Sequence, residues 1–258
     1  MNVAETYPQI QSEEPSAPDL SHLITEDDTP VDNRYSERQF SLLKIPLFES
    51  WEEGKPFEAL TDVGLFYKPS NEAVIVPDFL LSLGVEPREV SENKEDRSYF
   101  VWLYGKPPNL VIEVVSNKEG GELDRKFEIY QSIGVAYYAV HDPFRRLGQR
   151  ELRLFQLVGG RYVELANPCI LMEELGLALT FWEGTYLDVE ARWIRFVDAA
   201  GRIIPTGAER AILETEKTEQ EKARAEQARA EASAECERAE AAEARVRELE
   251  QRLRELEG

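Results

Sequence analysis

The sequence has little cysteine and little histidine. Its 258 residues include two cysteines, Cys169 and Cys236, and two histidines, His22 and His141. Two cysteines that lie far apart exclude a disulfide framework, and they also exclude zinc ribbons and zinc fingers. Two histidines are too few for a histidine-rich metal site.

Long apolar runs are absent as well. No run is long enough to span a bilayer, and residues 1–20 contain neither the basic stretch nor the apolar segment of a secretory signal. We therefore expect a cytoplasmic protein that does not contact a membrane. Apolar residues still make up 42% of the chain, which is enough for the core of one large domain or two ordinary ones.

Positive charge is scarce, because 50 Asp and Glu residues outnumber 30 Lys and Arg residues and the formal net charge is −20. Such a chain repels polyanions, which excludes a histone-like role. The acidic excess is uneven. Residues 1–32 hold eight acids, four prolines and no Lys or Arg, so we expect this segment to be disordered. Residues 33–207 are only mildly acidic, and we expect the folded domain there.

Residues 208–258 consist almost entirely of strong helix formers, with fifteen acids and ten bases. They predict one long helix, in which Val246, Leu249, Leu253 and Leu256 follow a coiled-coil spacing. Toward the amino end this seam continues mostly as alanine, which buries little surface. The segment is therefore either a weak coiled coil that mediates homo-oligomerisation or a solvated helix stabilised by spaced ion pairs.

Residues 33–207 alternate between helical and strand patterns. A helix is predicted from Asn33 or Ser36 to about Trp51, and Pro46 would kink or shorten it. Strands are expected at 63–68, 73–80, 110–116, 135–140, 151–158 and 161–165, with two further strand pairs near 177–187 and 193–204. A helix over 122–132, ended by Gly134, joins two of these strands as a crossover unit. We predict an α/β fold with one mixed central sheet flanked by helices, followed by the long carboxyl-terminal helix.

Two acidic residues occur inside strand patterns. Glu113 lies in the middle of the apolar run 110–115, and a carboxylate buried there needs a cation, a metal, several donors or a proton. Asp78 follows Pro77 within the run 74–81, where proline removes a ladder donor and implies a strand end, an edge or a bulge. Asp78 is therefore expected to project where backbone pairing is broken.

Lys126 lies on the helix predicted after Glu113, at the edge of its apolar stripe, so its ammonium can reach the carboxylates. Two acids and a lysine at the rim of a sheet are typical of metal-dependent phosphodiester hydrolysis. The acids bind a hard divalent ion that activates water, and the lysine positions that water or neutralises the developing charge. The structural alternative is that Asp78 caps a turn and Glu113 pairs with Lys126 in a buried ion pair.

Several motifs together resemble the Uma-two family of restriction-endonuclease-like proteins, which is assigned to the PD-(D/E)xK nuclease superfamily. They are Pro77-Asp78, RSYFVW at 97–102, PPNLVIEVVS at 107–116, Lys126 with Tyr130, Gly134-Val135 and Asp142-Pro143. The resemblance spans about residues 36–196 and extends to the charged, Ala-rich tail. It implies a restriction-endonuclease-like domain over 33–207. Asp78 and Glu113 would then be the metal-binding acids, the carbonyl of Val114 a further ligand, and Lys126 the catalytic lysine.

The chain departs from the family pattern in two places. The superfamily signature has a lysine two residues after the second acid, where this chain has Val115, so Lys126 would be a lysine supplied from the helix. Glu122 stands where the family usually has Asp, and Glu37 is a loose match to an additional acidic ligand. Phosphate contacts would fall to a modest basic group formed by Arg145, Arg146, Arg150 and Arg153.

Two hypotheses follow. The first is an endodeoxyribonuclease that depends on Mg²⁺ or Mn²⁺, in which Asp78 and Glu113 hold the ion and Lys126 assists the activated water. Its substrate would be DNA. The second is a catalytically inactive nuclease-like scaffold, whose carboxyl-terminal helix mediates oligomerisation or binds a partner.

Overall fold

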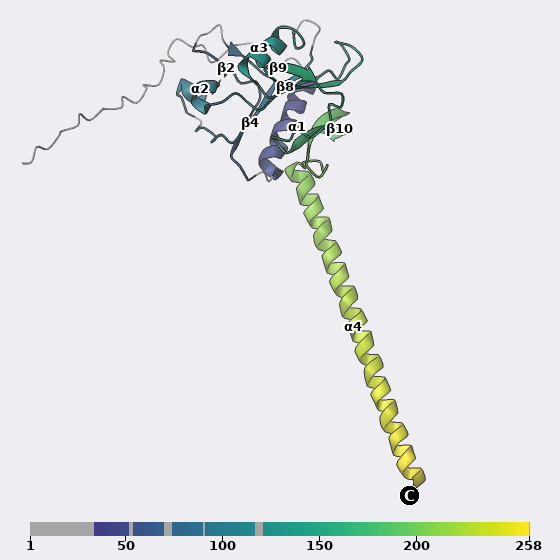
Figure 1. The fold of residues 1–258 in the computed structure, drawn as a ribbon. Helices are drawn as coiled ribbons and strands as arrows, with labels where there is room; N and C mark the ends of the chain where they lie inside the picture. The colour runs from purple at the N-terminus through teal and green to yellow at the C-terminus, as the bar shows by residue number, and fades with distance from the viewer. Residues whose placement is uncertain (1–33, 52–53, 70–73, 90, 117–120, 258) are drawn as a thin grey trace, which may run out of the picture. The chain divides into compact units, whose positions relative to one another are not determined.

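The computed structural model describes residues 34–51, 54–69, 74–89, 91–116 and 121–257. The disorder expected for residues 1–32 lies outside these ranges. The chain forms two units, the first ending at Ile204 and the second beginning at Pro205 (Figure 1). No helix in the described ranges combines the length and the apolar character that crossing a membrane requires.

The first unit is built on a six-stranded sheet with the strand order β1-β4-β6-β7-β8-β9. The strands are β1 (Phe57–Leu60), β4 (Phe79–Leu83), β6 (Leu110–Val114), β7 (Tyr137–His141), β8 (Leu152–Val158) and β9 (Arg161–Glu164). β6 and β7 are parallel, and the other neighbouring strands are antiparallel. The sheet is therefore mixed, as the sequence predicts.

The parallel pair requires a crossover connection, which the helix α3 (Arg125–Ile133) supplies. Gly134 ends this helix in a left-handed conformation with φ 90°, and its N–H donates to the carbonyls of Tyr130 and Gln131. A residue with a Cβ is strained at that φ, which explains why glycine stands there. The predicted crossover unit and its glycine stop are confirmed, although the helix begins at Arg125 rather than at Glu122.

The predicted mixed central sheet is confirmed, but it does not contain every strand, because two smaller sheets accompany it. One has the order β3-β2-β5, with β2 (Leu65–Phe66), β3 (Val74–Ile75) and β5 (Tyr99–Phe100). The other is a hairpin of β10 (Leu177–Tyr186) and β11 (Val189–Asp198). This one long hairpin replaces the two strand pairs expected near 177–187 and 193–204. Its turn residues, Leu187 and Asp188, have positive φ angles of 46° and 61°, as tight hairpin turns often require.

The run predicted as one strand at 73–80 is divided by its proline. β3 ends at Ile75 and β4 begins at Phe79, so Pro77 and Asp78 form a break between two sheets. Proline has no N–H to donate to a ladder, which explains the break. The sequence patterns gave no sign of β1, of β5, of the short helix α2 (Val101–Tyr104) or of the 3-10 helix at Lys94–Asp96.

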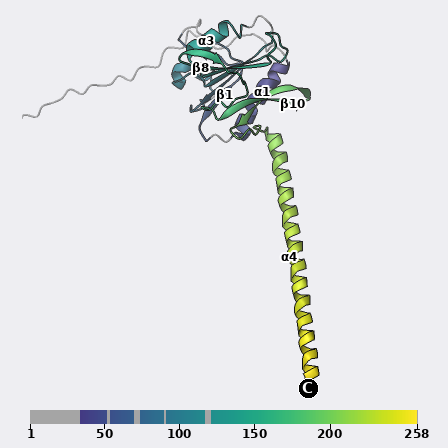
Figure 2. The ribbon, with the colours of Figure 1, turned by 45° about the vertical axis from the view of Figure 1, so that its right-hand side comes forward.

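The two faces of the large sheet pack into separate cores. Leu110 and Ile112 of β6 join one core together with Leu43 and Leu47 of the helix α1 (Arg34–Ser50) and with side chains of β10 and β11. Val111 and Val115 join the other core, with Tyr130 of α3 and Tyr138 and Val140 of β7. Figures 1 and 2 show α3 at the top of this unit and α1 further down, beside β10. Because side chains alternate along a strand, Glu113 belongs to the α3 face.

Pro46 lies inside α1, and the helix continues beyond it to Ser50, so the proline does not shorten the helix.

The second unit contains the predicted long helix, α4 (Gly207–Glu257). Its first turn is capped reciprocally: the N–H of Thr206 donates to Oε2 of Glu209 at 2.8 Å, and the N–H of Glu209 donates to Oγ1 of Thr206 at 3.2 Å. Along α4, Val246, Leu249 and Leu253 are all exposed.

Candidate active site

β4 and β6 place Asp78 and Glu113 on the same face of the sheet. Their antiparallel register pairs Phe79 with Ile112, and one further step places Asp78 opposite Glu113. Oδ2 of Asp78 also accepts a 2.6 Å hydrogen bond from the N–H of Val114. The break at Pro77 thus holds the Asp78 carboxylate against the neighbouring strand β6.

Glu113 is fully buried, and both of its carboxylate oxygens accept hydrogen bonds from α3. Nζ of Lys126 donates to Oε2 at 2.7 Å, and the hydroxyl of Tyr130 donates to Oε1 at 2.5 Å. Lys126 and Tyr130 are four residues apart, so they lie on one face of the helix. The structure therefore brings Asp78, Glu113 and Lys126 together, as the sequence predicts.

Tyr130 is the residue that the sequence interpretation missed. It stands in the predicted apolar stripe of α3 and in the family resemblance, and neither pattern reveals that its hydroxyl is bonded to Glu113. The spacing of Tyr130 from Lys126 could have predicted this contact. Residues four apart lie on the same face of a helix, so a tyrosine one turn after Lys126 can reach the same carboxylate, Glu113.

Glu122 also contributes a carboxylate. It precedes α3 and is only 4% exposed, and its Oε1 lies 3.8 Å from Nζ of Lys126. The hydroxyl of Tyr138 fixes the backbone of Glu122 by donating to its carbonyl at 2.8 Å. Oε2 of Glu122 is buried, and no group in the described part of the chain donates to it.

Burial and the neighbouring charges both shift the pKa values of the cluster. Burial, and then the Glu113 carboxylate, raise the pKa of Asp78 well above its usual range, against the opposing effects of Lys126 and the Val114 N–H. Burial raises the pKa of Glu113 as well, although Lys126 and Tyr130 counteract it. Burial alone would lower the pKa of Lys126, but the surrounding carboxylates, above all Glu113, raise it. Three carboxyl groups thus share one ammonium group.

The donor set fits a hard divalent cation. The acidic side chains offer only oxygen atoms as ligands, which hard divalent cations prefer. One of these oxygens, Oε2 of Glu122, is buried and has no hydrogen-bond donor in the described residues. Lys126 is 26% exposed, so solvent reaches the cluster on that side. Within the described ranges, no three His, Cys, Asp or Glu side chains are grouped closely enough to hold an ion by themselves. An ion would therefore need water, substrate or backbone oxygens besides Asp78 and Glu113.

Glu37 is not brought to this cluster. It lies on α1, which packs on the opposite face of the sheet, and its carboxylate is 3.2 Å from the guanidinium of Arg38. Val115, at the position of the superfamily lysine, is buried among the apolar side chains of the α3 face. The lysine that contacts Glu113 comes instead from α3, where Nζ of Lys126 lies 2.7 Å from Oε2.

The predicted basic group is largely neutralised by acids. Arg145 lies 3.6 Å from Glu151, and Arg150 and Arg153 lie 2.6 Å and 3.7 Å from Glu164. These pairs reduce the positive charge that the group can offer to phosphates.

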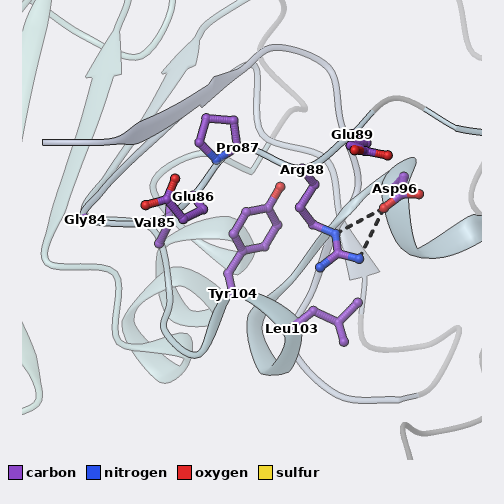
Figure 3. Close-up of a pocket in the computed structure, with 9 residues that line it drawn as sticks. All are labelled: Gly84, Val85, Glu86, Pro87, Arg88, Glu89, Asp96, Leu103 and Tyr104. Carbon is purple, nitrogen blue, oxygen red and sulfur yellow. Dashed lines mark hydrogen bonds and ion pairs between the residues drawn. The ribbon is translucent and has the colours of Figure 1, made fainter.

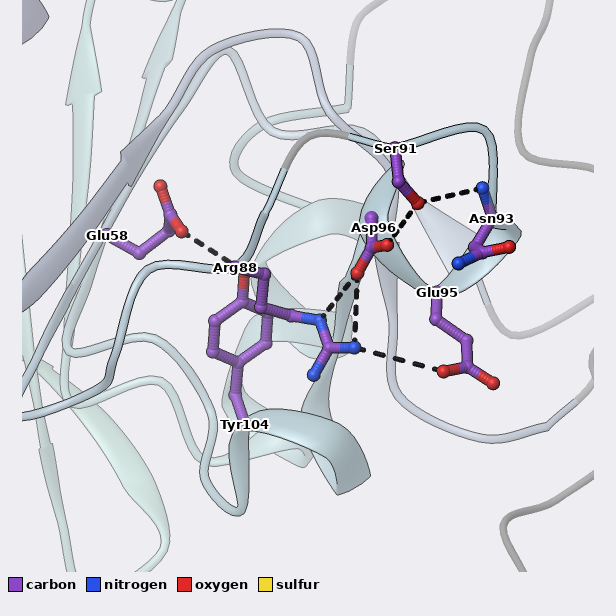
Figure 4. Close-up of polar contacts among 7 residues, drawn as sticks. All are labelled: Glu58, Arg88, Ser91, Asn93, Glu95, Asp96 and Tyr104. Carbon is purple, nitrogen blue, oxygen red and sulfur yellow. Dashed lines mark hydrogen bonds and ion pairs between the residues drawn. The ribbon is translucent and has the colours of Figure 1, made fainter.

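A separate cavity of about 530 Å³ lies beyond the other end of β4 from Asp78. Figure 3 shows its lining, with Tyr104 beside Arg88 and the acids Glu86, Glu89 and Asp96. Arg88 donates from Nε to Oδ1 of Asp96 at 3.2 Å, and Tyr104 donates to the buried Glu58 at 3.2 Å (Figure 4). Because its one cation is paired and the rest of its charges are negative, this cavity is a poor phosphate site.

Two comparisons with known proteins found a match. A family model described as "Uma2: Putative restriction endonuclease" matches residues 26–190. The crystal structure of a protein described as "a putative nuclease belonging to DUF820", from Anabaena variabilis, is similar to this chain. It is 13% identical, the match covers 56% of this chain and 73% of that one, and the TM-score is 0.37. Among curated proteins, none matches the chain.

Proposed function

The chain belongs to the Uma2 family of restriction-endonuclease-like proteins, and from this membership and the geometry of the cluster we propose that it is a metal-dependent endonuclease that hydrolyses DNA. One observation supports the proposal most directly. Asp78, immediately before β4, and Glu113, on the adjacent strand β6, are held together, and the ammonium of Lys126 lies 2.7 Å from Glu113 on a side chain that is 26% exposed.

In this proposal, Asp78 and Glu113 hold Mg²⁺ or Mn²⁺, and the carbonyl of Val114 is a further ligand. When bound, the ion supplies a Lewis acid and lowers the pKa of water that it binds. Tyr130 orients the Glu113 carboxylate from the side opposite Lys126. Lys126 faces the phosphate and neutralises charge that develops on it in the transition state. The excess of carboxyl groups disfavours their simultaneous ionisation without a cation, and this supports cation binding.

The overall charge sets the character of the interaction with DNA. A chain of net charge −20 with most of its basic group paired to acids makes few phosphate contacts. We expect weak binding that weakens further as salt rises.

A specific observation favours the second candidate, a nuclease-like scaffold without activity. Glu113 is completely buried and both of its oxygens already have donors, which is also the arrangement of a structural ion pair. In that case α4, with its exposed apolar residues, would be the functional element and would mediate homo-oligomerisation or bind a partner.

Cleavage of a linear DNA duplex by the purified chain in millimolar Mg²⁺ or Mn²⁺ distinguishes the two candidates. We expect Asp78→Asn and Glu113→Gln to abolish metal-dependent cleavage while the circular dichroism spectrum stays that of the wild type. Glu128→Gln, which neutralises an exposed acid on α3, is the matched control and should cleave normally. Undiminished cleavage by the Asp78→Asn, Glu113→Gln double variant contradicts the proposed site. Failure of the wild type to bind Mg²⁺ in calorimetry at millimolar concentration favours the scaffold.

A further inference from the structure

Lys126 lies between two carboxylates but is hydrogen-bonded to only one of them. Its Nζ is 2.7 Å from Oε2 of Glu113 and 3.8 Å from Oε1 of Glu122. Glu122 is only 4% exposed, and its Oε2 is a buried acceptor to which no group in the described ranges donates. A buried carboxylate oxygen without a donor is unfavourable, so Glu122, which contacts the lysine only through Oε1 at 3.8 Å, is incompletely satisfied.

We propose that Glu122 is a positioning residue that receives the Lys126 ammonium when Glu113 binds a divalent ion. This inference rests on the proposed function, because it requires an ion at Asp78 and Glu113. Without an ion, Lys126 is hydrogen-bonded to Glu113 and contacts Glu122 only at 3.8 Å. With an ion, Glu113 is compensated by the ion, and Lys126 moves to Glu122. Each carboxylate then has a cation.

The local geometry makes this exchange small. Charge-assisted N–H···O bonds are about 2.8 Å long, so Lys126 has to come only about 1 Å closer to Glu122. The backbone of Glu122 is held by the Tyr138 hydroxyl, and the N–H of Lys126 donates to the carbonyl of Gly121 at 3.0 Å. The helix and the preceding turn can therefore stay in place while the flexible lysine side chain moves.

The exchange also solves an electrostatic problem. An ion beside Glu113 repels the ammonium that is bonded to the same carboxylate, and this repulsion opposes ion binding. If Lys126 had no second carboxylate, it would lose its only close partner at the moment when a divalent cation arrived. Glu122 thus lowers the cost of ion binding, and it keeps the lysine at the edge of the site, where a phosphate can meet it.

Glu122→Gln separates this role from a purely structural one, because the two roles predict different effects on the metal-free protein. The substitution removes a buried charge that has only a long ion pair and one oxygen without a donor, so the melting temperature in chelator should equal or exceed that of the wild type. Calorimetric titration with Mg²⁺ should instead give a Kd that is higher by about 10- to 100-fold, the usual effect of removing a residue that orients a metal ligand. Glu122→Asp keeps the carboxylate and should recover most of the affinity. Glu128→Gln is the matched control on α3 and should change neither quantity.

Each outcome decides the inference. An unchanged Kd for Mg²⁺ in Glu122→Gln overturns it. A clear fall in the melting temperature of the metal-free Glu122→Gln variant also overturns it, because Glu122 would then stabilise the fold as an ion-pair partner of Lys126. A wild-type chain that binds no Mg²⁺ refutes the proposed function and this inference with it. A wild type that binds Mg²⁺, with Glu122→Gln binding equally well, refutes this inference alone.

Discussion

At the scale of single residues, the unusual feature is a carboxylate, Glu113, that is buried among apolar strand residues and satisfied by one charged and one neutral donor. The sequence was sufficient to predict that Glu113 needs partners and that Lys126 could be one of them, because strand burial and helix periodicity are local patterns. It was not sufficient to predict the hydroxyl of Tyr130 or the buried oxygen of Glu122. Their contacts depend on how closely α3 packs on the sheet.

The hydroxyl of Tyr130 should contribute measurably to stability. Tyr130→Phe removes the donor to Oε1 of Glu113, and a buried acceptor left unsatisfied costs about 1–3 kcal/mol in unfolding free energy, more when it is charged. The loss also raises the pKa of Glu113 further, because Tyr130 is one of the two donors that lower it. Urea denaturation in chelator, with the m-value checked, measures the effect.

Tyr162→Phe is the control for this prediction. The Tyr162 hydroxyl donates to the backbone carbonyl of Val135 at 2.9 Å, a neutral hydrogen bond away from Glu113. Its removal should cost less, about 0.5–1.5 kcal/mol. Equal losses in the two variants would show that the bond to the carboxylate has no special importance.

At the scale of elements, the sequence predicted those units whose ends are marked locally. Gly134 marks the end of α3, and Pro77 marks a break in backbone pairing. The number of sheets was not predictable in this way. β2 pairs in parallel with β5, and the two strands are two residues long and separated by more than thirty residues. Such short strands form because distant segments pack together, and propensity does not reveal them.

The contact between α1 and β7 should make stability depend on pH. His141 ends β7 and is buried, with Nε2 2.8 Å from the Tyr35 hydroxyl of α1 and Nδ1 3.1 Å from the carbonyl of Glu151. Burial lowers the pKa of His141 to about 4, although Glu151 and Asp142 oppose the shift. The unfolded chain, in which a histidine has a pKa of about 6.5, therefore binds more protons than the folded chain in this window. Stability from this group is complete above about pH 6.5 and is lost as pH falls toward 4.

His141→Gln should remove this dependence. Between pH 7.5 and pH 5, the wild type should lose about 2 kcal/mol more unfolding free energy than the variant, as linkage to this shift requires. Glutamine can still bond to the Glu151 carbonyl, so the two proteins can be compared at each pH by urea denaturation. Parallel pH profiles would mean that His141 titrates normally in the fold.

At the scale of the whole molecule, the notable features are the acidic charge and the long helix α4, which lies outside the residues that the family model matches. α4 was predictable from composition alone, because it has no proline and consists of strong helix formers. What covers it was not predictable, since an alanine seam is compatible with both a coiled coil and a solvated helix. Val246, Leu249 and Leu253 remain more than half exposed, at 54%, 52% and 58%, and lie at the spacing of a coiled-coil seam.

We expect these three side chains to be covered by a second copy of the chain, because a single helix leaves them all in water. Light scattering coupled to size exclusion should therefore give the mass of a dimer for the full chain at tens of micromolar. A Leu249→Glu, Leu253→Glu variant should be a monomer, since two buried acids per helix oppose the seam. A Gln227→Glu, Gln251→Glu variant adds the same charge to α4 at positions outside that seam and should remain a dimer. The same mass for all three proteins would show that these leucines take no part in assembly. α4 would then be a solvated helix held by its spaced ion pairs, such as Arg252 with Glu248 at 2.9 Å.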